Sequence, residues 1–138
     1  MSLETLKSLV TTVILALALI QALEMLQVRG YLSLLPVKKR QLRQLHRRGG
    51  IVVLVLTVTV AVICMSSFGY VLYSLRVKAH VTMGALAILV LLVKVAISNR
   101  FRRYLRYLRL TLALGTAAGL LILGVFVTSA LWYLLQVA

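Results

Sequence analysis

The chain consists of four long, mostly apolar runs separated by shorter polar or basic stretches. The apolar runs cover residues 3–28, 50–70, 79–97 and 110–136. About 20 apolar residues, at ~1.5 Å of helical rise each, cross a hydrocarbon core of ~30 Å. The pattern therefore predicts four transmembrane helices in a single membrane domain, residues 1–138.

The second run is rich in β-branched residues, which favour strands in water. Within a bilayer a lone strand leaves its backbone groups without hydrogen-bond partners, whereas a helix satisfies them internally. We therefore expect a helix here as well, and an all-α four-helix bundle. Pro36 lies where a helix from the first run would have to stop.

Composition supports an integral membrane protein. Hydrophobic residues make up 62% of the chain, and Glu4 and Glu24 are its only acidic residues. The mean hydropathy is +1.05, and a soluble domain of this size could not bury so much apolar surface. Cys64 is the only cysteine, which excludes an internal disulfide and metal motifs built from several cysteines.

Basic residues are distributed unevenly between the connections. The stretches 29–48 and 99–109 hold twelve of the sixteen Lys and Arg, against Arg76 and Lys78 between the second and third runs. Short loops rich in Lys and Arg stay in the cytoplasm. The chain is therefore predicted to have two basic cytoplasmic loops and both termini on the outer side, in a membrane such as the bacterial inner membrane.

The net charge of +14 could indicate nucleic-acid binding. The basic residues lie beside membrane spans, however, and there is no soluble domain to form a groove, so we expect them to set topology and contact anionic lipids. Within residues 99–112, apolar and basic residues separate onto two helical faces, which predicts an interfacial amphipathic segment. The residues expected to face lipid are Lys38, Lys39, Arg40, Arg43, Arg47, Arg48, Arg102, Arg103 and Arg106.

The two histidines lie at opposite ends of their spans, His46 before the second run and His80 at the start of the third. A membrane thickness separates them, so they cannot ligate one haem within one chain. We expect His46 to belong to a basic rim. His80 lies inside a membrane span, where ionisable residues are costly and usually functional, so it is the candidate axial metal ligand.

Neighbours of His80 fit a flat macrocycle. Gly84, one helical turn on, would leave room for it, and Arg76 and Lys78 could pair with its carboxylates. The alternative is that His80 forms a hydrogen bond with Tyr70, Tyr73 or a lipid head group.

Several short motifs resemble the small four-helix bundles related to cytochrome b561 and the ferric-reductase transmembrane domain. They are LHRRGG at 45–50, HVTMG at 80–84, Lys94, and SALW at 129–132, and the resemblance covers about residues 40–135. It implies a b-type-cytochrome-like electron-transfer subunit with haem b on His80.

This chain departs from that pattern in its second span. The resemblance implies a second histidine there, where this chain has Ile63, Cys64 and Met65. The options are a sixth ligand from Met65 or Cys64, a five-coordinate site, a ligand from a neighbouring subunit, or no haem. The alternative function is a cofactor-free accessory subunit of a larger respiratory or photosynthetic complex, in which His80 could also bind a chlorin.

Two further interactions concern packing. Glu24 and Lys94 each lie four positions before the predicted cytoplasmic end of their spans, so we expect them at equal depth as an ion pair. Arg29 is the other possible partner of an ionised Glu24. The alternative to an ion pair is that Lys94 snorkels to the interface while Glu24 stays protonated or meets head groups. Gly115 and Gly119 are spaced for close helix packing, either with other membrane subunits or in a homo-oligomer.

No other catalytic constellation is present in the sequence. The two carboxylates lie at opposite ends of the first run, and the histidines are far apart. The sequence therefore lacks the clustered side chains that hydrolytic or metal-assisted catalysis needs, so an enzyme acting alone is not expected.

Overall fold

The computed structural model describes residues 3–34, 36–68, 74–99 and 108–137, and the regular structure within these ranges is helical. Four helices are long and apolar enough to cross a membrane. Near its end, the last of them contains a five-residue π-helical segment, η2. The elements in chain order are α1 (Leu3–Val28), α2 (Lys39–Phe68), α3 (Leu75–Asn99), α4 (Leu108–Phe126), η2 (Val127–Leu131) and α5 (Trp132–Val137).

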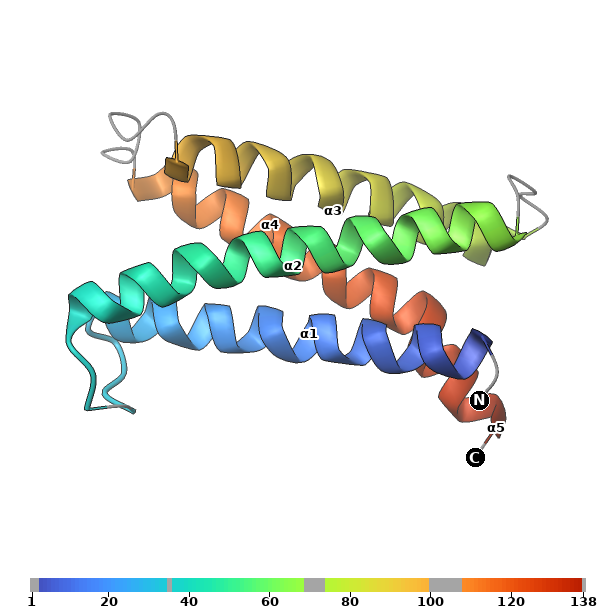
Figure 1. Ribbon diagram of the computed structural model, residues 1–138, viewed down its shortest axis with the longest axis horizontal. Coiled ribbons are helices and arrows are strands. Elements are labelled where there is room, and N and C mark those ends of the chain that lie inside the picture. Colours follow the sequence, from blue (N-terminus) through green and yellow to red (C-terminus); the bar gives the residue numbers. More distant parts are fainter. Residues whose placement is uncertain (1–2, 35, 69–73, 100–107, 138) are drawn as a thin grey trace.

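The helices form an antiparallel bundle of two pairs (Figure 1). α1 packs most extensively on α2, and α3 on α4, while α1–α4 and α2–α3 contacts join the pairs. Both chain termini lie at the end of the bundle where α2 ends and α3 begins, which we call the termini end. The opposite end, where α1 and α3 finish and α2 and α4 start, is the basic end.

The core is narrow and draws on all four long helices. Its buried members are Ile14, Val53, Ala87, Leu91, Ala118 and Ile122. Many large apolar side chains point outward instead, among them Leu19 (58% exposed) and Leu120 (63% exposed). An apolar exterior around a small core is what lipid as solvent allows, so the predicted all-α membrane bundle is confirmed at this level.

α1 ends at Val28, as predicted for the first apolar run. Gly30 has a left-handed backbone, with φ of 84°. Its N–H donates to the Gln27 carbonyl, and the Tyr31 N–H donates to the Leu26 carbonyl, both at 3.0 Å. This is the pattern of a Schellman cap, which favours glycine because a side chain is strained at positive φ. Gly30, rather than Pro36, terminates the helix.

The start of α2 corrects the predicted span. The sequence prediction placed residues 39–48 in a loop, but α2 is helical from Lys39. Leu, Gln and Arg are good helix formers, and Leu42 is buried (2% exposed), so this segment gains from continuing the helix. The amphipathic segment predicted for residues 99–112 lies largely outside the described residues.

α3 also begins earlier than predicted, at Leu75 rather than residue 79. Ser74 caps it, because its hydroxyl accepts a hydrogen bond from the Val77 N–H at 3.3 Å and its carbonyl accepts one from Lys78 N–H at 3.0 Å. Serine is among the preferred residues at this position.

Candidate functional site

His80, in the first turns of α3, lies beside the π-helical segment η2 at the termini end. Its Nδ1 is 3.2 Å from the Thr128 hydroxyl. That hydroxyl has a single hydrogen, which it donates to the Gly124 carbonyl at 2.8 Å. His80 Nδ1–H must therefore be the donor to Thr128, which leaves Nε2 with a free lone pair.

The π-helical segment explains why Thr128 can hold this position. A π-helical turn frees backbone carbonyls from their usual partners and often marks a functional site. Here two hydroxyls bond carbonyls in the preceding turn of α4, since Thr128 reaches the Gly124 carbonyl and Ser129 reaches the Val125 carbonyl, both at 2.8 Å. The bond to Gly124 holds the threonine hydroxyl beside His80.

Arg76 and Lys78, the candidate carboxylate partners, differ in the structure. Arg76 donates from its guanidinium to the Thr128 carbonyl at 3.0 Å and lies over the Trp132 ring, 4.9 Å from its centroid. It is therefore engaged in joining α3 to the last helix. Lys78 is exposed one turn beyond Ser74, so its ammonium group is the more accessible of the two.

The residues around His80 fit one axial histidine better than a clamp of two ligands. A Cβ added at Gly84 would meet no atom within 4 Å, so there is space one turn from the imidazole. Met65 is 47% exposed on α2 and points out of the bundle, so a macrocycle held between His80 and Met65 does not fit this packing. Among the described residues, no group of three His, Cys, Asp or Glu could hold a bare metal ion.

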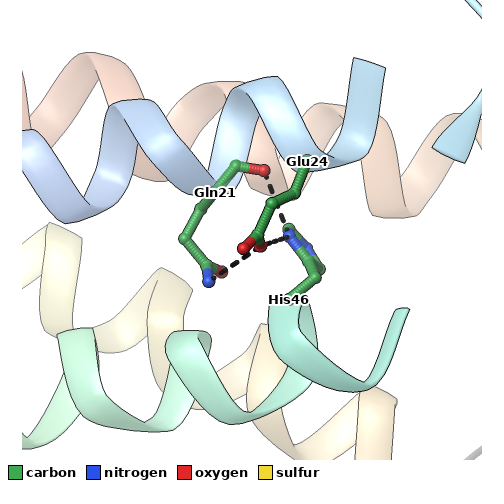
Figure 2. Close-up of polar contacts among 3 residues, drawn as sticks. All are labelled: Gln21, Glu24 and His46. Carbon is green, nitrogen blue, oxygen red and sulfur yellow. Dashed lines mark hydrogen bonds and ion pairs between the residues drawn. The ribbon is translucent and has the colours of Figure 1, made fainter. Parts of the chain in front are cut away.

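A second polar site, at the basic end, joins α1 to α2 (Figure 2). His46 Nδ1 lies 3.1 Å from the Gln21 backbone carbonyl and 3.8 Å from Glu24 Oε2. The Gln21 side-chain amide reaches the same carboxylate oxygen at 3.4 Å. Because a carbonyl only accepts, His46 Nδ1 carries a hydrogen and donates it to Gln21.

Burial makes this cluster more than a surface contact. The Glu24 side chain is 6% exposed and that of His46 is 16% exposed. His46 is therefore not a member of an exposed basic rim, as its arginine neighbours had suggested. The sequence prediction was wrong because it located His46 from Arg47 and Arg48 and not from the helix across from it.

Gly49 makes room for Gln21 in this site. A Cβ added at Gly49 would overlap the Gln21 amide nitrogen, whereas one at Gly50 would be in ordinary contact at 3.7 Å. The absence of a side chain on α2 thus lets the Gln21 amide lie against the helix. One atom, the Gln21 Oε1 oxygen, remains buried without a hydrogen-bond partner.

The predicted Glu24–Lys94 ion pair does not form directly in the described structure. Each helix packs mainly on its two neighbours in the bundle, and α1 and α3 are diagonal to one another. The Glu24 carboxylate instead lies 3.8 Å from His46 Nδ1. Lys94 and His46 both line a recess between α2 and α3.

Gly115 and Gly119 do not pack against another helix of the same chain. No atom lies within 4 Å of an added Cβ at either position. The close approach of α4 to α3 is at Gly124 instead, where an added Cβ would meet the Met83 sulfur. Any packing role of Gly115 and Gly119 therefore concerns a second chain.

The predicted lipid-facing residues that the structure describes are all exposed at the basic end. They are Lys38, Lys39, Arg40, Arg43, Arg47 and Arg48. Arg102, Arg103 and Arg106 lie outside the described residues, as do Tyr70 and Tyr73, the suggested partners of His80.

Three residues of the two sites were missed by sequence reasoning: Gln21, Thr128 and Trp132 as a partner of Arg76. A glutamine inside an apolar run was the available signal for the first, because polar groups in lipid need partners. Thr128 and Ser129 give a weaker signal, since hydroxyls often bond their own helix.

Comparison with known proteins identifies a family. No curated protein and no solved structure matches the chain. A family model described as "Family of unknown function (DUF6529)" matches residues 1–138.

Proposed function

Because the chain belongs to the DUF6529 family, a family of unknown function, we propose its role from its own geometry: a small membrane subunit for electron transfer that holds a tetrapyrrole on His80. The observation that carries the proposal is the fixed imidazole. Thr128 binds Nδ1, which leaves Nε2 as the ligating nitrogen. A partner on the other ring nitrogen is the usual arrangement of a metal-binding histidine.

Each residue around His80 has a separate proposed role in binding the tetrapyrrole. His80 supplies the axial nitrogen, Gly84 leaves space beside it, and Lys78 is the accessible cation for carboxylates. Arg76 and Thr128 act on the histidine by fixing α3 against the last helix. Haem b, when bound, supplies one-electron chemistry, and a chlorin needs the same single axial ligand.

The orientation proposed for this subunit follows from charge. Twelve of the sixteen Lys and Arg lie in the two stretches at the basic end. The positive-inside rule assigns that end to the cytoplasm, which puts both termini and His80 at the outer face of a membrane such as the bacterial inner membrane.

A second candidate is a cofactor-free accessory subunit that packs against other membrane subunits. It is favoured by Met65, one of the two suggested ligands from α2, which is 47% exposed. It is also favoured by the open faces at Gly115 and Gly119, which leave room for a partner helix.

The test is the absorption spectrum of the purified full chain, oxidised and reduced, with His80→Ala and His46→Ala as a matched pair. We expect a Soret or chlorin band that is lost in His80→Ala and retained in His46→Ala, with helical circular dichroism unchanged in both. A band that survives His80→Ala, or that both variants lose equally, contradicts the role of His80. Wild-type protein without a tetrapyrrole band favours the accessory subunit.

A further inference from the structure

A small recess opens between α2 and α3 at the basic end. Its volume is about 10 Å³, which suits one water-sized group. Its polar lining comes from His46 and Arg47 of α2 and from Lys94, Ser98 and Asn99 of α3. The side chains of Arg47, Lys94, Ser98 and Asn99 can each donate a hydrogen bond, and none of the lining residues is acidic.

The chain cannot neutralise Lys94 from its own residues. Its only acids are Glu4 and Glu24, and Glu4 begins α1 at the termini end. Glu24 is held by Gln21 and His46 and does not line the recess. A charged lysine within a membrane span requires a partner or a route to the interface, and any anionic partner of Lys94 comes from outside the chain.

The position of Lys94 along α3 indicates where that anion lies. Lys94 is five residues before Asn99, the last residue of the helix, which places it about 7–8 Å from the helix end at 1.5 Å per residue. A lysine side chain at that depth can extend toward the lipid head groups, and Arg43 and Arg47 are exposed on α2 at the same end. Anionic lipids accumulate at such basic surfaces.

We infer that the recess between α2 and α3 binds the phosphate group of an anionic phospholipid, with one phosphate oxygen seated beside Lys94 and Ser98. Lys94 supplies the charge, and Ser98 and Asn99 supply neutral donors. His46 lines the recess without donating into it, because its one N–H, on Nδ1, is already donated to Gln21. This site is independent of the tetrapyrrole proposed on His80.

Native mass spectrometry of the full chain in detergent tests the site with three probes: phosphatidylglycerol, phosphatidylcholine and inorganic phosphate. Wild-type protein should retain phosphatidylglycerol in preference to phosphatidylcholine. Lys94→Gln should weaken phosphatidylglycerol binding by at least about tenfold, the loss expected for a charge-assisted hydrogen bond. Lys78→Gln is the matched control, because Lys78 is exposed on the same helix at the termini end, and it should bind like wild type.

Three results would overturn the inference. They are wild-type affinity in Lys94→Gln, equal retention of the two lipids by wild-type protein, and displacement of phosphatidylglycerol by an equal concentration of inorganic phosphate, which would assign the recess to a free anion. Asn99→Ala provides a second variant if Lys94→Gln fails to fold. It should weaken binding of phosphatidylglycerol and leave retention of phosphatidylcholine unchanged. None of these measurements depends on a bound tetrapyrrole.

Discussion

Each histidine of this chain uses Nδ1 to bind a neighbouring helix. His46 of α2 binds the Gln21 carbonyl of α1, and His80 of α3 binds the Thr128 hydroxyl of η2. Each histidine therefore links the two helices of one tightly packed pair. His46 does so at the basic end and His80 at the termini end. Interhelical hydrogen bonds in membranes contribute about 0.6 kcal/mol on average and up to about 2 kcal/mol, so each contact adds modestly to stability and fixes the ring.

A double-mutant cycle distinguishes the observed partner of Glu24 from the predicted one. Glu24→Gln and His46→Gln should show a coupling free energy of about 0.5–1.5 kcal/mol, because contacting polar residues are not additive. Glu24→Gln and Lys94→Gln should be additive within about 0.5 kcal/mol. The measurement is reversible unfolding in mixed micelles. Stronger coupling of Glu24 to Lys94 would restore the ion pair inferred from sequence.

The residues of the basic-end site show what sequence can and cannot give. Equal depth for Glu24 and Lys94 follows from counting residues to the helix ends. Which helices are neighbours does not, because an apolar run presents similar faces all round. His46 reaches Glu24 only because α2 continues as a helix through residues 39–48 and Gly49 admits Gln21.

At the scale of elements, small residues decide how closely the helices approach. Gly124 on α4 faces Met83 on α3, and Gly119 faces no other helix of the chain. Both glycines lie in α4 within similar apolar sequence, so their spacing alone could not show which of them contacts another helix. The sequence prediction selected the pair with the four-residue repeat, and the structure shows that the contact within the chain is one turn or more further on.

Leucine substitutions at these two glycines should therefore differ. Gly124→Leu forces side-chain volume onto Met83 and should destabilise the bundle by about 1–3 kcal/mol, the usual cost of overpacking. Gly119→Leu should leave the unfolding midpoint within error and change only association with a second chain. Unfolding in detergent and size-exclusion chromatography measure the two effects. A larger loss of stability in Gly119→Leu would contradict the packing of α4.

Helix ends were predicted less well than the spans themselves. Membrane length and hydropathy fixed the four apolar centres, because lipid requires a continuous apolar stretch. The ends depend on local capping instead, by Gly30 after α1 and by Ser74 before α3. The end of α1 at Val28 agrees with the predicted first span, although the positive φ of Gly30 that caps it could not be read from the sequence.

At the scale of the whole molecule, the bundle separates its chemistry by depth. The His80 site lies at the termini end, and the Gln21–Glu24–His46 site and the recess lie at the basic end. The core between them is apolar. The proposed tetrapyrrole site at the outer face and the proposed phospholipid site at the inner face require the same orientation, with the basic end in the cytoplasm.

The orientation is therefore the central claim, and labelling of single cysteines with a membrane-impermeant maleimide tests it most directly. Two exposed glutamines provide a matched pair in a Cys64→Ala background: Gln41 at the basic end and Gln136 at the termini end. In intact cells carrying the protein in the inner membrane, with the outer membrane permeabilised, Gln136→Cys should be labelled. Gln41→Cys should be labelled only after the inner membrane is opened. Labelling of Gln41→Cys, and not of Gln136→Cys, before the inner membrane is opened would contradict the account.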